Sequence, residues 1–247
     1  MQSTRILISA GVAAIALGAA SVTFALSPND YSLFGDAEYV SPGNASNRAV
    51  ELSSDTTGSF SGIDYGLGTT SMTVADISSL STDYKFDEGS CGGGSPRFQV
   101  EVASSSGNTG NIFVYIGPPP SYTGCPAGVW TTSGELIGTG PVDTSQLDGG
   151  TFYDPYATAL VKYGDYEVTG ISLVADAGWA FSPDGQVVEV DNTTVDTTLY
   201  TYEIPVPTAK DECKNGGWQN LADDEGDAFR NQGQCVSFIE RNERARQ

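Results

Sequence analysis

The chain has 247 residues, of which 31 are acidic, 11 are basic and none is histidine, and its net charge is −20. A surface this acidic repels phosphate backbones, so the composition argues against nucleic acid as a partner. Without histidine, Ser-His-Asp and Cys-His nucleophiles, histidine general bases and histidine metal ligands are excluded. The remaining chemistry rests on carboxylates, tyrosine, lysine and metals with oxygen ligands.

The first 25 residues have the pattern of a secretory signal peptide. Arg5 precedes an apolar run that ends at Leu17, and small residues follow up to Ala25. This run is too short to cross a bilayer and ends in an A-x-A-like cleavage site. We therefore predict removal of residues 1–25, no membrane span in the mature protein, and a secreted or cell-surface location.

The rest of the chain divides into three predicted parts. These are an N-terminal extension at 26–47, a β-domain at 48–205 and a small C-terminal module at 206–247. The module combines a Gly-rich acidic stretch with a short helix predicted at 236–246. It is too small to hold its own core, so we expect it to depend on a disulfide.

Short runs of apolar or alternating residues, separated by Gly, Ser, Asp and Pro, predict strands throughout the β-domain. The clearest run, at 97–102, places Phe98, Val100 and Val102 on one buried face. The predicted strands are weaker at 48–53, 59–65 and 71–77 and clearer at 97–102, 112–116, 171–174, 187–190 and 199–204.

One helix is predicted inside the β-domain. Asp154 can cap its first turn, and Pro155 occupies a position where no N–H is needed. Ala157, Leu160 and Val161 would form its buried side. Many short strands with a single helix predict a mainly β fold. We expect a jelly-roll-like β-sandwich with one short helix and a small disulfide-linked helical appendage.

The four cysteines should form disulfides, because their number is even and the chain is predicted to be exported. Proximity along the chain gives the pairs Cys91–Cys125 and Cys213–Cys235, one of three connectivities that four cysteines allow. The alternative is that the bridges tie the C-terminal module to the β-domain.

The C-terminal module contains the sequences CKNGGW at 213–218 and NQGQCV at 231–236. This pattern resembles a short C-terminal module of many uncharacterised secreted bacterial proteins, from which it departs by an acidic insertion at 223–227. The resemblance covers a small part of the chain. It implies export and a Cys213–Cys235 bridge, and it implies no activity.

A second pattern lies within residues 168–195, with GISLV at 170–174, GW at 178–179 and VDN at 190–192. It resembles the closing strands of jelly-roll carbohydrate-binding modules. In such modules the Asp of the last strand often ligates a structural calcium ion, and aromatic side chains stack on sugar rings. The resemblance implies glycan binding, with Asp191 as the corresponding calcium ligand.

Calcium prefers six to eight oxygen ligands, which this acidic chain can supply. Asp191 closes one predicted strand, and Asp55 follows an early strand that a jelly roll would place beside it. These two residues are our candidate calcium ligands. The alternative is that both aspartates cap turns.

Sugar recognition by a β-module needs aromatic platforms and a few polar partners. The candidate ligand-binding residues are Trp130, Tyr153, Tyr156 and Trp179, because each stands at the edge of a predicted strand or helix. The alternative is that these side chains fill the core of the sandwich.

Paired carboxylates raise an enzymatic hypothesis. Glu189 and Asp191 occupy alternate positions of one strand and project from the same face. The pattern is similar to the Glu-x-Asp-x-x-Glu of laminarinase-like hydrolases, but Thr194 stands where that family has its acid/base glutamate. We therefore expect a non-catalytic glycan- or surface-binding protein. An extracellular structural protein without a small ligand is the alternative, and a glycoside hydrolase is the third hypothesis.

Overall fold

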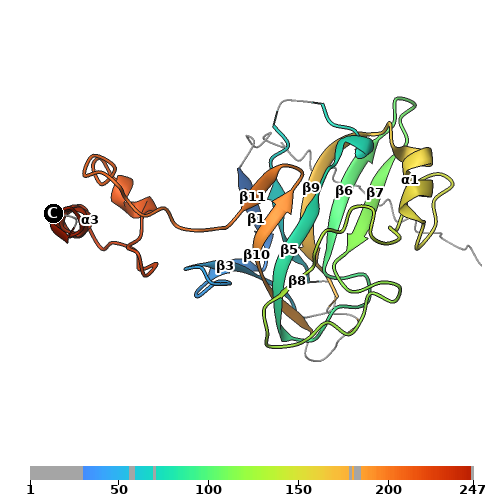
Figure 1. Cartoon of the computed structure of the whole chain (residues 1–247). Coiled ribbons are helices and arrows are strands. Elements are labelled where there is room, and N and C mark those ends of the chain that lie inside the picture. The colour runs from blue at the N-terminus through green and yellow to red at the C-terminus, as the bar shows by residue number, and fades with distance from the viewer. Residues whose placement is uncertain (1–29, 56–58, 69–70, 178–179, 181–184, 246–247) are drawn as a thin grey trace, which may run out of the picture.

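Two antiparallel sheets pack face to face in the computed structural model, which describes residues 30–55, 59–68, 71–177, 180 and 185–245 (Figure 1). In spatial order, the first sheet consists of β1 (Tyr31–Gly35), β4 (Ser61–Tyr65), β9 (Glu167–Ala175), β6 (Arg97–Ala103) and β7 (Thr109–Tyr115). The second sheet consists of β2 (Ala37–Val40), β3 (Ala49–Ser54), β10 (Gln186–Val195), β5 (Leu80–Glu88) and β8 (Thr131–Thr132), and β11 (Thr198–Tyr200) also pairs with β10.

Helical segments are short and few in the described part of the chain. They are η1 (Val74–Asp76), α1 (Tyr156–Tyr163), η2 (Gly217–Asn220) and α3 (Gln232–Ala245). This confirms the predicted mainly β sandwich with a helical C-terminal appendage. Within the described residues, no helix combines the length and the apolar composition needed to cross a membrane.

The space between the sheets is filled by the apolar half of each alternating strand. In β6, Phe98, Val100 and Val102 are at most 2% exposed, while the polar residues between them point outward. In β10, Val188 and Val190 are fully buried. Burying one such side chain contributes roughly 1.5–3 kcal/mol, so the alternation fixes which face of each strand points inward.

A chain of buried hydroxyl groups links the two sheets through this core. Tyr65 Oη in β4 lies 2.7 Å from Tyr202 Oη, which donates to Thr193 Oγ1 in β10 at 2.8 Å. Thr193 Oγ1 also lies 2.8 Å from Thr82 Oγ1 in β5. Burial raises the pKa of both tyrosines. The hydroxyls thus stay protonated, and hydrogen bonding offsets the cost of removing them from water.

The sandwich includes two strands from the segment 26–47, which sequence analysis sets apart as an extension. β1 pairs with β4, with Tyr31 opposite Tyr65, and β2 pairs with β3, with Ala37 opposite Leu52. Both are edge strands with only half-buried or exposed residues. Their apolar pattern is weak, so the sequence gives no strand signal for them. Such edge strands can be held mainly by backbone pairing with the neighbouring strand.

The helix α1 lies where predicted, but its cap and its buried side differ from the prediction. Its N-cap is Pro155 and has no side-chain capping hydrogen bond. The Asp154 carboxylate instead pairs with Lys162 Nζ at 2.7 Å. Val161 is 88% exposed, whereas Tyr163 is buried. The apolar residues of this helix do not lie along a single face, so its sequence does not define a buried side. Packing against the rest of the protein determines which residues are buried.

Two disulfides are present, Cys91–Cys125 and Cys213–Cys235, which is the pairing that proximity predicts. The first lies within the sandwich. The second lies in the C-terminal module, which follows an extended segment at the end of the sandwich (Figure 1). Around it the module forms a small core of its own from Leu221, Phe229, Phe238 and Ile239, so the expectation that it is too small to hold one is wrong.

Replacing Cys213 and Cys235 together by serine should destabilise the module alone. The bridge spans 22 residues, and losing a loop closure of this length costs about 3 kcal/mol. Hydrogen–deuterium exchange should therefore accelerate in the module and stay unchanged in the sandwich. The control variant, Cys91→Ser with Cys125→Ser, should accelerate exchange in the sandwich instead. Unchanged exchange in the module of the first variant would contradict the prediction.

Candidate functional site

The outer face of the first sheet carries polar and aromatic side chains in rows that cross the strands. Residues directly paired on neighbouring strands share a face. The first row is Phe34, Gly62, Val174, Arg97 and Tyr115. The second is Ser32, Asp64, Ser172, Gln99 and Phe113. Strand pairing thus gathers side chains from five separate segments on one surface.

An open pocket of about 490 Å³ lies over these rows, and we call it the outer pocket. A Cβ added at Gly62 would lie only 2.4 Å from the Phe34 ring. The ring therefore packs directly over this glycine, where a residue with a side chain would not fit. The outer pocket is lined by Phe34, Ser59, Phe60, Asp64, Arg97, Gln99, Glu101, Ser172, Val174 and Asp176.

An ion pair fixes Arg97, the one cationic side chain among the described residues that line the outer pocket. Arg97 Nη1 and Nη2 donate to the two carboxylate oxygens of Asp176 at 2.6 and 2.7 Å, and Nη1 also donates to the Gly94 carbonyl at 2.8 Å. The guanidinium carbon lies 4.6 Å from the centre of the Phe113 ring. Bidentate pairing and stacking hold a guanidinium in a single orientation. Asp176 therefore both positions Arg97 and neutralises its charge.

Two further carboxylates in the outer pocket have no cationic partner among the described residues. Asp64 Oδ1 accepts a hydrogen bond from Ser172 Oγ at 2.7 Å. Glu101 is exposed, and its carboxylate lies over Gly170, where an added Cβ would stand 2.9 Å from Oε2. With the amide of Gln99, they supply hydrogen-bonding groups that face solvent.

Two aromatic rings line the outer pocket, and a second aromatic group lies at the neighbouring strand β7. In the pocket, Phe34 and Phe60 have ring centres 6.1 Å apart, and Phe60 is 53% exposed. At β7, Tyr115 pairs with Arg97, and its ring centre lies 6.2 Å from that of Tyr153, which is 50% exposed and stacks parallel to Tyr122. Tyr153 and Tyr122 have φ values of 55° and 52°, a backbone conformation that bulky residues rarely adopt.

The three described members of the four aromatic residues predicted to bind sugar lie in different places. Tyr153 lies next to Tyr115 of β7 and is not among the residues that line the outer pocket. Trp130 lies at the second sheet, with its ring centre 5.6 Å from Lys85 Nζ. Tyr156 is half-buried and packs against the main core, and Trp179 lies outside the described residues. A ligand-binding role for these side chains stays a prediction.

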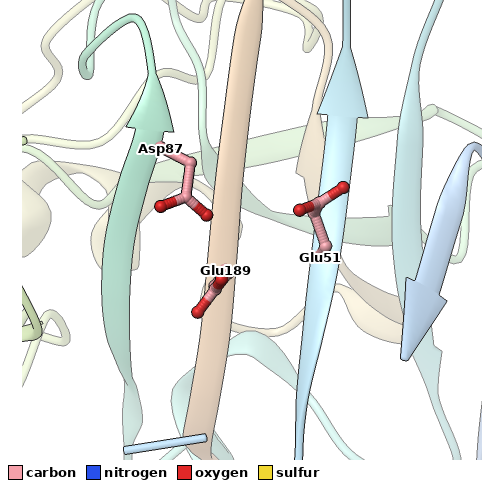
Figure 2. Close-up of side chains that lie close together, drawn as sticks. All are labelled: Glu51, Asp87 and Glu189. Atoms are coloured by element: carbon pink, nitrogen blue, oxygen red, sulfur yellow. The ribbon is translucent and has the colours of Figure 1, made fainter. Parts of the chain in front are cut away.

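The second sheet carries a row of carboxylates on its outer face. Glu38, Glu51 and Glu189 pair directly across β2, β3 and β10, and Lys85 in β5 pairs with Glu189. Asp87 stands two residues beyond Lys85 on the same face. We call the four carboxylates the acidic row, and Figure 2 shows Glu51, Asp87 and Glu189 side by side. Like charges directly opposite one another destabilise a sheet.

Lys85 partly offsets this repulsion. Its Nζ lies 2.8 Å from Glu189 Oε2 and 3.4 Å from Asp87 Oδ1. Burial raises the pKa of Glu189, although Lys85 opposes the shift. Burial also raises the pKa of Glu51, and the charges of Glu38 and Asp87 add to the shift.

Acidic groups come close enough to share a metal ion at two places in the described chain. Glu51, Asp87 and Glu189 each offer an oxygen within 4.8 Å of the others, and so do Asp223, Asp224 and Glu225. Carboxylate oxygens are suitable ligands for calcium. At the acidic row, however, the Lys85 ammonium already occupies the position of a counter-ion.

The structure does not bring the candidate calcium ligands Asp55 and Asp191 together. β3 and β10 are neighbours, as predicted, but they run antiparallel, with Ser54 opposite Gln186 and Val50 opposite Val190. Asp55 therefore lies near the start of β10 and Asp191 towards its end. At roughly 3.4 Å per residue, this register separates them by about 20 Å.

Asp191 holds the loop 41–47 against the second sheet. Its carboxylate accepts hydrogen bonds from Asn44 N at 2.9 Å, Ser46 Oγ at 2.6 Å and Asn192 N at 2.7 Å. Asp191 is fully buried, and Glu189 is 8% exposed. Burial raises the pKa of Asp191, although these hydrogen bonds lower it. The Glu-x-Asp pair is thus not accessible to a substrate. It therefore gives no support to the hydrolase hypothesis.

The residues that line the outer pocket are not among those predicted from the sequence. A signal for three of them was present, because the alternation that buries Phe98 and Val100 also projects Arg97, Gln99 and Glu101 together from the opposite face. The sequence could not show that Phe34, Phe60 or Asp176 would join them. Those residues come from an edge strand and from loops whose positions depend on strand pairing.

No protein-family model matches the chain, and no curated protein matches it. Three solved structures are distantly similar. The family 11 carbohydrate-binding module of the cellulosomal cellulase Lic26A-Cel5E of Clostridium thermocellum has 16% identity and a TM-score of 0.39, covering 70% of this chain and 91% of that one. CtCBM11, studied in solution, has 19% identity and a TM-score of 0.38, covering 69% and 85%. An exo-beta-agarase has 13% identity and a TM-score of 0.31, covering 73% of this chain and 25% of the agarase.

Replacing Glu51 by glutamine should stabilise the protein at neutral pH. Because the folded-state pKa of Glu51 is raised, its ionised form destabilises the fold, and this penalty disappears as the pH falls through that pKa. We expect the free energy of unfolding in urea to rise by about 0.5 kcal/mol near pH 7 and the gain to shrink towards about pH 4.5. The exposed Asp148→Asn variant is the control. A gain that does not depend on pH would contradict the prediction.

Proposed function

We propose that this protein is a secreted, non-catalytic glycan-binding module whose binding surface is the outer pocket together with Tyr153. The observation that carries the proposal is the composition of that pocket. The rings of Phe34 and Phe60 line it beside fixed polar side chains, and the exposed Tyr153 lies next to Tyr115, the partner of Arg97 on β7. Glycan sites combine these two features, since apolar ring faces pack on aromatics and hydroxyl groups need directed hydrogen-bond partners.

The order of the pocket favours binding without a large rearrangement. Arg97 is held by Asp176 and by the Phe113 ring, and Asp64 is held by Ser172. Side chains fixed before a ligand arrives lose little conformational entropy on binding. The outer pocket extends over four strands, β1, β4, β9 and β6, which are spaced about 4.8 Å apart, or about 14 Å in all. This length suits a chain of several sugar rings better than a single monosaccharide.

Calcium remains a prediction and is not part of this surface. The described acidic groups that could share an ion lie on the second sheet and in the C-terminal module. The residues of the outer pocket are held by hydrogen bonds and an ion pair among themselves. We therefore expect glycan binding to survive chelation of calcium.

Affinity electrophoresis of the oxidised protein in gels that contain hydroxyethylcellulose, chitosan or polygalacturonate tests the proposal. At least one polysaccharide should retard the protein, and Phe60→Ala or Gln99→Ala should weaken that retardation about tenfold, because each removes a pocket contact. The control is Trp130→Ala, which removes an aromatic ring from the second sheet and should change nothing. The same gels run with calcium and then with chelator test the calcium prediction.

Two results would overturn the proposal. One is the absence of retardation in every gel. The other is retardation that Trp130→Ala abolishes while the pocket variants retain it, which would move the site to the second sheet.

A further inference from the structure

The charge of the outer pocket restricts which glycans it can take. Residues 26–205 contain most of the 31 acidic side chains of the chain and only four basic ones. Each basic side chain is engaged within the sandwich. Arg48 stacks on Tyr39, and the other three form ion pairs, namely Lys85 with Glu189, Arg97 with Asp176 and Lys162 with Asp154.

Within the outer pocket, this pairing leaves an excess of negative charge. Asp176 neutralises Arg97 through two hydrogen bonds. Asp64 and Glu101 remain, and neither has a cationic partner among the described residues. A glycan that carries carboxylate or sulfate groups would therefore meet repulsion, whereas a glycan that carries ammonium groups would meet two unpaired carboxylates.

The positions of the two carboxylates suit a ligand that lies across the strands. Asp64 belongs to β4 and Glu101 to β6, and β9 runs between them. On β9 the intervening outward residues are Ser172 and Gly170, which are small. Glu101 extends over Gly170, and Asp64 bonds to Ser172. Both carboxylates thus lie above the same strand, with nothing large separating them.

We propose that the outer pocket binds amine-bearing glycans, such as glucosamine polymers, in preference to neutral and acidic ones. The inference rests on the proposed glycan-binding function and specifies its substrate class. The rings of Phe34 and Phe60 contact the faces of the sugar rings. Asp64 and Glu101 accept charge-assisted hydrogen bonds from the amino groups.

Isothermal titration calorimetry with a matched pair of ligands tests this inference. The glucosamine hexamer and its fully N-acetylated form share one backbone and differ in charge. At about pH 5.5, where ordinary carboxylates are ionised, the glucosamine hexamer should bind at least tenfold more tightly, and added salt should reduce that difference. The Asp64→Asn, Glu101→Gln double variant should bind both hexamers within about twofold of each other.

A control variant separates local charge from the overall charge of the protein. Glu38→Gln with Asp148→Asn neutralises two exposed carboxylates outside the outer pocket and should keep the preference. If that variant loses the preference as fully as the pocket variant, general attraction explains the result and the inference is wrong.

Hexalysine tests for a basic peptide as the ligand. If it binds as tightly as the glucosamine hexamer and depends on Asp64 and Glu101, the inference is also wrong.

The two hexamers also distinguish this inference from the function on which it rests. Equal affinity of the wild-type protein for both hexamers would overturn the preference for amines and leave glycan binding intact. Failure to bind either hexamer, together with retardation by hydroxyethylcellulose alone, would also overturn the preference for amines and leave glycan binding intact. Failure to bind any glycan would overturn both.

Discussion

The register of the central strands is the constraint on which the rest of this structure depends. β10 pairs with β3 on one side and with β5 on the other. Its alternation sends Val188 and Val190 into the core and Glu189 and Asp191 outward. Because the side-chain period of a strand is two, a slip of one residue would exchange these sets and place two carboxylates in the apolar core between the sheets. Both the apolar core and the polar outer faces therefore follow from one register.

The same alternation gives the two outer faces different chemical character. On the first sheet it displays Arg97, Gln99 and Glu101 beside aromatic rings, and the result is an open pocket with ordered polar groups. On the second sheet it aligns glutamates in adjacent strands, and Lys85 is drawn into that row as a counter-ion. The first arrangement leaves hydrogen-bonding groups free for a ligand. In the second, Lys85 forms ion pairs with Glu189 and Asp87.

Asp191 shows how a buried carboxylate can be satisfied by hydrogen bonds alone. An aspartate at the end of a strand in an acidic chain suggests a metal ligand. In the folded protein, two backbone N–H groups and the Ser46 hydroxyl surround its carboxylate. These donors compensate for burial in the same way as a cation would, because a carboxylate is satisfied by either. The aspartate therefore secures the loop 41–47.

The sequence by itself determined the fold class, the strands β6, β7, β9, β10 and β11 and the position of α1, and it favoured the observed pairing of the cysteines. These features depend on local patterns: the period of two, a proline at a helix start, and the proximity of cysteines along the chain. Strand pairing decided what local patterns do not contain. It brought the edge strand β1 beside β4, set Asp55 and Asp191 at opposite ends of a strand pair, and assembled the outer pocket from side chains as distant in sequence as Phe34 and Asp176. Residues that meet only through pairing carry no common local signal, so the candidate site became visible only in the tertiary structure.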